Sequence, residues 1–178
     1  MDIVTGMFWI LLVVIVIFFG LKTTQFMVIS AYVEDALAAS NLASAVIDVK
    51  EYGKSHQIII EDPMEAYGLF RASLCRNLQL DDYLYPYEDS LLTSKLQLAE
   101  YRIYNVNEEG VEVYIIGSAG VITDCFSGKK GEVFTPDGIC VTATTVYSRV
   151  LFEVKGIGEQ NIQAKKEKSV DIVRYENE

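Results

Sequence analysis

A long apolar run at the N-terminus constrains the fold of this 178-residue chain more than any other feature of its sequence. Between Ile3 and Leu21 the run is broken only by one Thr and two Gly residues. About twenty such residues are needed for a helix to cross a hydrocarbon core of roughly 30 Å. The sequence therefore predicts a single membrane-spanning helix over about residues 3–21. The residues predicted to contact lipid or a helical bundle are Met7, Phe8, Trp9, Ile10, Leu11, Leu12, Val13, Val14, Ile15, Val16, Ile17, Phe18 and Phe19.

A cleavable secretory signal is the main alternative for this run. Such a signal begins with Lys or Arg and ends at a cleavage site of small residues. The leading residues here are MDIVTG, with Asp2 and no basic side chain, and the run is followed by LKTTQF. We therefore expect the segment to remain in the mature protein.

The sequence after the run contains nothing that ends a helix for several more turns. No Pro occurs between Lys22 and Tyr52, and the next Gly is Gly53. Helix propensity therefore permits one helix over residues 1–53, with a membrane-spanning half followed by an amphipathic half. Such a helix would extend for about 75 Å.

Two kinds of side chain recur at helical spacing in the amphipathic half. Phe26, Ile29, Val33 and Leu37 supply apolar surface. Small residues recur every four positions and would let helix backbones approach closely. This surface either covers the chain's own sheet or docks neighbouring helices. Direct continuation from a membrane span favours the second interpretation. The predicted helix-packing residues are Ala36, Ala39, Ser40, Ala43 and Ser44.

The remainder of the chain predicts a globular α+β domain over residues 54–178. Asp62, Pro63 and Glu65 form a helix-start pattern, with a capping side chain, a Pro in the first turn and an acid three residues after the cap. A second helix is predicted over 63–78, with Leu69, Phe70 and Leu74 as its buried stripe.

From Leu96 onward the apolar pattern changes to a period of two, which is typical of strands. NVNEEGVEVYIIG has the composition of a hairpin centred near Glu109 and Gly110. With the later segments GVITDCF, CVTATTVYSRVLFEVKG and NIQAKKEKSVDIVRYE, it predicts an antiparallel sheet of four or five strands. The mixed-charge run AKKEKS would suit an exposed sheet edge.

The Tyr-rich connection DDYLYPYEDS allows two interpretations. Its tyrosines either form a binding surface or pack against an edge of the sheet, and the second is the more common use of such residues.

No motif in the chain proposes a reaction. His56 is the single histidine, which excludes most zinc sites, and the acidic pairs lack calcium-loop spacing. The net charge of −10 argues against nucleic acid, whose phosphates need a basic face. We expect no enzymatic activity, no cofactor and no metal.

Cys125 and Cys140 flank a loop that contains Gly, Lys and Pro. They would form a disulfide if the domain lies in an oxidising compartment, and otherwise they are two unpaired thiols. Cys75, on the predicted second helix, is expected in the core.

The order of these features resembles a known family. A short tail, an apolar span, a continuing helix with AYVEDALAASNLASAV and a C-terminal antiparallel sheet are similar to type IV pilin-like proteins, and most similar to the TadE-like minor pilins of tight-adherence pilus systems. The ending TATTVYSRVLFEVKGIGEQNIQAKKEKSVDIV also resembles the tail of such proteins. The resemblance covers nearly the whole chain.

The resemblance implies a structural subunit of a pilus or secretion apparatus. Its expected partners are the lipid bilayer, other pilin-like subunits, a prepilin peptidase and the assembly machinery. It implies one membrane span, an extracytoplasmic C-terminal domain and incorporation into a surface pilus. The alternative is an extracellular binding module for which the helix is a simple tether.

Processing and orientation are the points where this sequence departs from the pilin pattern. Pilins carry a basic leader that ends in Gly and an acidic fifth residue after cleavage. Gly6 would give a start at Met7, but the leader lacks Lys and Arg, and the fifth residue is Leu11. Lys22 follows the span, which by the positive-inside rule favours a cytoplasmic domain, whereas a disulfide would favour the opposite side.

Overall fold

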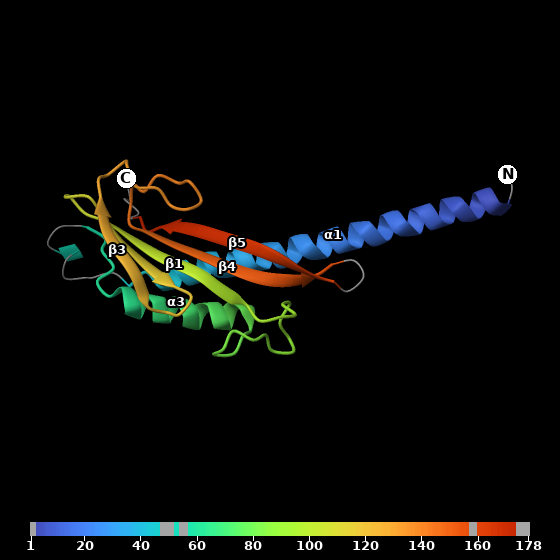
Figure 1. Cartoon of the computed structure of the whole chain (residues 1–178), viewed down its shortest axis with the longest axis horizontal. Coiled ribbons are helices and arrows are strands. Elements are labelled where there is room, and N and C mark those ends of the chain that lie inside the picture. The colour runs from blue at the N-terminus through green and yellow to red at the C-terminus, as the bar shows by residue number, and fades with distance from the viewer. Residues whose placement is uncertain (1–2, 47–51, 54–56, 157–159, 174–178) are drawn as a thin grey trace.

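The computed structural model describes residues 3–46, 52–53, 57–156 and 160–173. A long helix, α1 (Ile3–Ala43), runs along the domain and then projects far beyond it toward the N-terminus (Figure 1). The described residues also contain a second helix, α3 (Pro63–Leu78), and a five-stranded sheet. The α+β architecture with one further helix is therefore confirmed.

The sheet is antiparallel throughout, with the order β3-β2-β1-β4-β5. The predicted hairpin joins β1 to β2, where the Asn107 side chain accepts hydrogen bonds from the backbone N–H groups of Glu109 and Gly110. The edge strand β5 carries the charged run, as predicted. The strands are β1 (Gln97–Val106), β2 (Val111–Gly117), β3 (Ile122–Gly128), β4 (Thr145–Lys155) and β5 (Asn161–Asp171).

The two helices cover one face of the sheet, and residues 129–144 lie over part of the other. The larger core joins Leu37 of α1, Phe70 and Leu74 of α3, and Tyr101 and Ile103 of β1. A smaller core on the opposite face contains Tyr104 and Tyr147 from the strands with Val133 and Val141 from the covering segment. The sheet is thus buried on both faces over its centre.

Helix α3 begins and ends as its sequence predicts. The carboxylate of Asp62 accepts hydrogen bonds from the backbone N–H groups of Met64 and Glu65, at 2.8 and 3.1 Å. Phe70 and Leu74 are fully buried, but Leu69 is exposed, so its place in the predicted stripe was wrong.

Helix α1 ends at Ala43, ten residues before the predicted end at 53. Ser44 donates its hydroxyl to the carbonyl of Asn41, and the backbone N–H of Ala45 bonds only three residues back, to Leu42. Side-chain bonds of this kind compete with the helical ladder. The prediction of helix over 44–46 was wrong, and 47–51 lie outside the described residues.

The predicted division of the chain after residue 53 also separates residues that share one core. Ile29, Val33 and Leu37 of α1 are buried together with α3 and the sheet. The globular unit therefore includes the C-terminal part of α1, and only the N-terminal part stands free of it.

Candidate functional site

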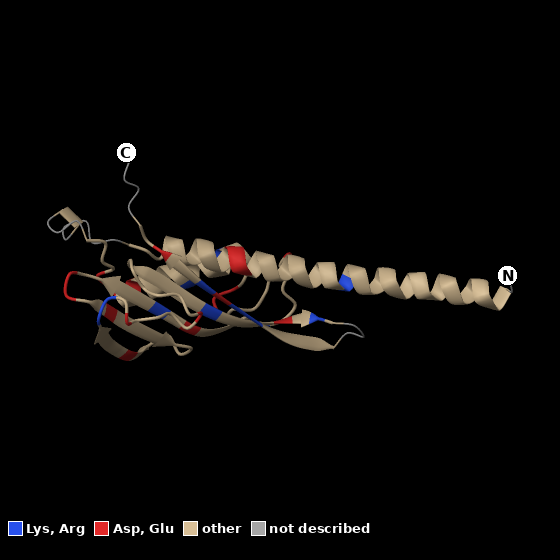
Figure 2. Ribbon diagram, turned by 90° about the horizontal axis from the view of Figure 1, so that it is seen from above, with Lys and Arg blue, Asp and Glu red and all other residues tan. Residues whose placement is uncertain are grey.

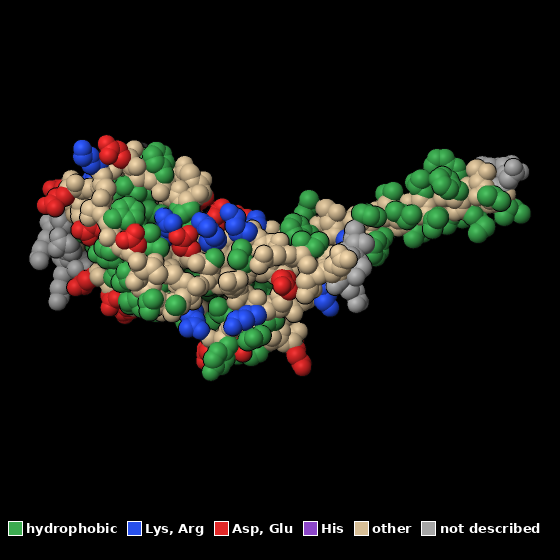
Figure 3. All heavy atoms as spheres, viewed as in Figure 1, with side chains coloured by type: hydrophobic (Ala, Val, Ile, Leu, Met, Phe, Trp, Pro, Cys, Tyr) green, Lys and Arg blue, Asp and Glu red, His purple; other side chains and the backbone are tan. Residues whose placement is uncertain are grey.

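The free part of α1 is apolar over its whole surface. Every residue from 7 to 19 is exposed, from 38% at Leu12 to 67% at Met7 (Figure 3). None of the most apolar stretch of the helix is buried, and by length and composition it could cross a membrane. Exposed apolar patches of such extent mark a membrane or protein interaction site. The predicted processing site, Gly6–Met7, lies inside this helix.

The C-terminal part of α1 presents a buried face to its own domain. Tyr32 donates its hydroxyl to the backbone carbonyl of Asn77 on α3, at 2.5 Å, and Asn77 donates to the Ser40 hydroxyl, at 3.3 Å. Ser40 itself donates to the carbonyl of Ala36, so its hydroxyl is satisfied although it is fully buried. Small side chains at 36 and 40 thus let α1 lie close to α3.

The same face of α1 also bonds to the sheet. The amide of Asn41 donates to the backbone carbonyl of Lys168 on β5, at 2.9 Å. Tyr101 of β1 donates to the hydroxyl of Ser44, at 2.8 Å. Two lysines of β5, Lys166 and Lys168, each approach the carboxylate of Glu34 to 2.9 Å. Hydrogen bonds from these lysines, that from Lys168 foremost, hold the pKa of Glu34 below its ordinary value.

The opposite side of α1 is exposed from the end of the span to the end of the helix. We call this surface the open face. Figure 2 shows few charged residues, coloured blue or red on the ribbon, along α1. Val28 is 54% exposed and Leu42 62% exposed. At 100° per residue these positions fall on one side of the helix. The open face consists of Val28, Ala31, Asp35, Ala39, Leu42 and Ala43.

The structure therefore separates the predicted helix-packing residues into two sets. Ala39 and Ala43 lie exposed on the open face. Ala36, Ser40 and Ser44 are buried in the chain's own domain, so they are not free to meet another helix.

The sequence contained a signal for this separation. Ala36, Ser40 and Ser44 follow Ile29, Val33 and Leu37 by seven residues each. Positions seven apart share one side of a helix. The small residues on the apolar side therefore serve the fold, and those on the other side stay accessible.

No protein-family model, curated protein or solved structure matches this chain.

The Tyr-rich connection forms a second exposed surface. Tyr83, Tyr85 and Tyr87 are 74%, 52% and 60% exposed, so the expectation that they pack against a sheet edge was wrong. The loop is nevertheless well tied, because the carboxylate of Asp81 accepts the backbone N–H groups of Tyr83 and Tyr85 at 2.9 and 2.8 Å. The ammonium of Lys95 lies 4.9 Å from the centre of the Tyr85 ring.

The three cysteines are all free thiols. Cys125 is exposed on the edge strand β3, and Cys140 is half-buried in the segment that follows β3. Cys125 and Cys140 therefore do not form a disulfide in this structure. Cys75 is half-buried against the core, and this burial raises the pKa of its thiol.

Clusters of side chains that could bind a metal ion are absent from the part of the chain that the structure describes. No three His, Cys, Asp or Glu side chains within it are placed to hold a metal ion. His56 lies outside the described residues.

Proposed function

We propose that this chain is a membrane-anchored, pilin-like structural subunit, of the TadE-like type, that contributes to the assembly of a Tad or type IV-like pilus or secretion apparatus. Residues 3–21 hold the subunit in the bilayer, and the open face of α1 joins it to neighbouring subunits. The domain lies outside the cytoplasm, and a prepilin peptidase that cuts after Gly6 leaves residues 7–21 as the span of the mature subunit.

The observation that carries this proposal is the continuity of α1. The helix passes from the apolar span to the domain without a break, and one side of it stays exposed along its whole length. A simple tether needs neither the straight continuation nor the accessible small residues. A helix that packs against other helices needs both.

The energetics favour an exchange of lipid contacts for protein contacts. Burial of apolar surface contributes roughly 25 cal/mol per Å², so a span of this length loses tens of kcal/mol if it enters water. The subunit is therefore stored in the bilayer until its helix passes into a bundle. In the bundle the apolar surface remains away from water, and close packing at Ala39 and Ala43 supplies specificity.

Leucine substitutions on the open face test the proposal. Ala39→Leu and Ala43→Leu replace exposed side chains, so we expect the domain to stay folded while incorporation into sheared surface filaments falls strongly. Ala72→Leu is the matched control, because Ala72 is an exposed alanine of the other helix. Normal incorporation of both open-face variants would count against the proposal.

Ala36→Leu separates folding from assembly in the same experiment. Ala36 is 5% exposed beside α3, so the larger side chain should destabilise the domain itself, by about 1–3 kcal/mol. A variant that loses both its fold and its filaments is thereby distinguished from an open-face variant that keeps its fold and loses only its filaments.

A second function is favoured by the exposed tyrosines. Tyr83, Tyr85 and Tyr87 present aromatic area on a tied loop, and tyrosine is enriched in binding interfaces. We propose as the alternative that the chain is an anchored extracellular binding module. In that case replacement of these tyrosines by Ala abolishes binding to cells or surfaces, while Ala39→Leu has no effect.

A further inference from the structure

A groove lies between α1 and the hairpin of β4 and β5, at the level where the apolar span ends. Its volume is about 400 Å³, and α1 contributes Lys22, Thr23 and Phe26 to its wall. Val154, Lys155 and Ile162 of the hairpin form the facing wall. This hairpin reaches farther along α1 toward the N-terminus than the rest of the sheet (Figure 1).

The position of Lys22 places the groove relative to a bilayer. Lys22 is the first charged residue of α1 and directly follows the apolar run. Lysines that flank a span lie at the headgroup level of the membrane. If residues 3–21 cross the hydrocarbon core, the mouth of the groove therefore faces phospholipid headgroups.

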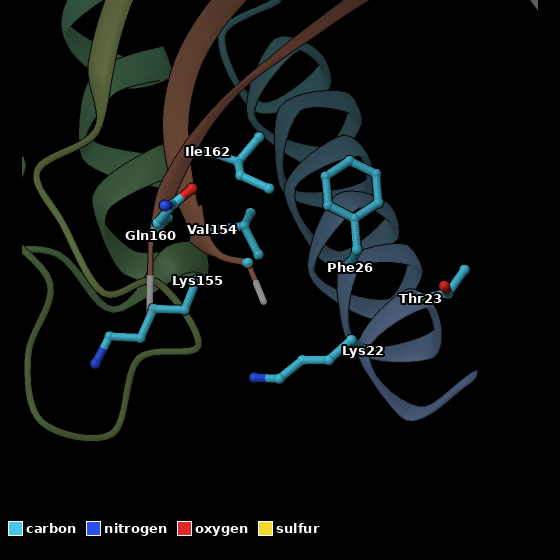
Figure 4. Close-up of a pocket in the computed structure, with 8 residues that line it drawn as sticks. Lys22, Thr23, Phe26, Val154, Lys155, Gln160 and Ile162 are labelled. Atoms are coloured by element: carbon cyan, nitrogen blue, oxygen red, sulfur yellow. The ribbon is translucent and has the colours of Figure 1, made fainter. Parts of the chain in front are cut away.

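The walls of the groove are apolar, and two of their side chains, Phe26 and Ile162, are exposed, whereas Val154 is buried. Phe26 lies across from Val154 and Ile162 (Figure 4). The side chains of Phe26 and Ile162 are 41% and 52% exposed. Such walls suit the glycerol and upper acyl region of a lipid better than they suit water.

The charged side chains among the described lining residues of the groove are Lys22 and Lys155. Lys22 and Lys155 extend toward the same end of it (Figure 4). Neither forms an ion pair with any of the residues that the structure describes, and no Asp or Glu occurs in the described lining. Two unpaired ammonium groups above an apolar surface complement a phosphate that carries acyl chains.

We propose that this groove binds an anionic phospholipid of the bilayer that α1 crosses. Lys22 and Lys155 contact the phosphate, and the exposed side chains of Phe26 and Ile162 contact the glycerol and the first part of the acyl chains. The bound lipid ties the hairpin to α1 at the membrane surface and so fixes the angle of the domain. This inference rests on the membrane anchoring in the proposed function and is independent of subunit assembly.

Lipid retention by the full-length protein tests the proposal. The protein is delipidated in detergent, mixed with equal amounts of phosphatidylglycerol and phosphatidylcholine, and its bound lipids are counted by native mass spectrometry. We expect the anionic lipid to be retained preferentially. Lys22→Gln and Lys155→Gln should each weaken its binding about fivefold, the effect of one cation beside an anionic lipid surface.

Three controls make the result specific to the groove. Lys129→Gln with Lys130→Gln removes two lysines from the segment after β3 and should leave retention unchanged. Lys155→Arg should retain the lipid. Inorganic phosphate at the same concentration should not displace it.

Any of three results would overturn the proposal. These are equal retention of the two lipids, unchanged retention by the variant that carries both Lys22→Gln and Lys155→Gln, and displacement of the lipid by inorganic phosphate. Carbonate extraction of the protein from vesicles distinguishes this failure from failure of the anchor. If the wild-type chain is extracted, the membrane anchoring itself is wrong. If it stays in the vesicles without preferring the anionic lipid, only the groove proposal fails.

Discussion

The hydroxyl of Tyr101 on β1 donates a 2.8 Å hydrogen bond to the hydroxyl of Ser44, the first residue after the end of α1. Both side chains are fully buried. The bond joins two positions that are far apart in the sequence, and it fixes the end of the helix against the centre of the sheet.

Tyr101→Phe is predicted to lower the free energy of unfolding by about 1 kcal/mol, because it removes one net hydrogen bond and keeps the ring packing. The ring stays beside Phe70, whose centroid lies 4.7 Å away, and Ser44 still donates to Asn41. Chemical unfolding of the full-length protein in detergent measures the change. Tyr83→Phe, at an exposed tyrosine, is the control and should have no effect.

A loss of stability at alkaline pH is predicted from the same residue. Burial raises the pKa of Tyr101 above its ordinary value. Tyr101 in the unfolded chain ionises near pH 10, so the contribution of this residue to stability is constant below about that pH and then falls by about 1.4 kcal/mol per pH unit. Unfolding curves between pH 8 and 11.5 test this expectation. A slope that is the same in Tyr101→Phe would contradict it.

Glu34 predicts a smaller effect at acid pH. Its pKa is lowered mainly by the hydrogen bond from Lys168, so its contribution is present above about pH 4.3 and is lost as the pH falls through the folded-state pKa. The Glu34 and Lys168 side chains are 37% and 38% exposed, so solvent weakens the pair. Glu34→Gln should lower stability at pH 7 by no more than about 1 kcal/mol, and this difference from the wild type should shrink as the pH falls below about 4.3.

Asp35→Asn is the control for this measurement, because Asp35 is the exposed neighbour of Glu34 on the other side of α1. An equal loss of stability in the two variants at pH 7 would show that the ion pairs contribute nothing specific.

The cysteines are predicted to differ in reactivity. Cys125 is exposed, whereas Cys75 is half-buried and its pKa is raised by burial, which lowers the thiolate fraction at neutral pH. N-ethylmaleimide at pH 7.5, without reductant, should therefore modify Cys125 well before Cys75. If Cys125 and Cys140 were both protected until reductant is added, the native protein would contain the disulfide.

Local sequence signals predicted much of the fold. The Asp62, Pro63 and Glu65 pattern located the start of α3, and the turn residues before Val111 located the first hairpin. These signals depend on neighbours in sequence, so one chain suffices to interpret them.

The features that were missed depend on distant contacts. The end of α1 is set by Ser44 and its partner Tyr101, which lies 57 residues later in the sequence. Helix propensity depends on local sequence and therefore does not predict this contact. An irregularity between Leu98 and Glu100 places Leu98 on the helix-covered face, against simple alternation. Tyr83 is exposed in a loop whose backbone N–H groups bond to the carboxylate of Asp81, and the composition of the loop did not predict this exposure.

The candidate site was predicted in part. The apolar span and its continuation follow from composition. The division of small residues between the domain and the open face was missed, because the prediction grouped them by four-residue spacing and not by their seven-residue spacing from the buried apolar residues. Ala36 and Ala39 have the same side chain, and the packing of Tyr32 and Ser40 against Asn77 shows that the side of α1 that carries Ala36 faces α3.

A photo-crosslinking residue placed at Ala39 of the full-length chain, in its native membrane, tests the central claim most directly. We expect adducts that mass spectrometry maps to the apolar N-terminal helix of a neighbouring subunit, with none from the same probe at Ala72. Absence of protein adducts at position 39, together with protein adducts from a probe at Tyr85, would contradict it and would make α1 a tether for a binding domain.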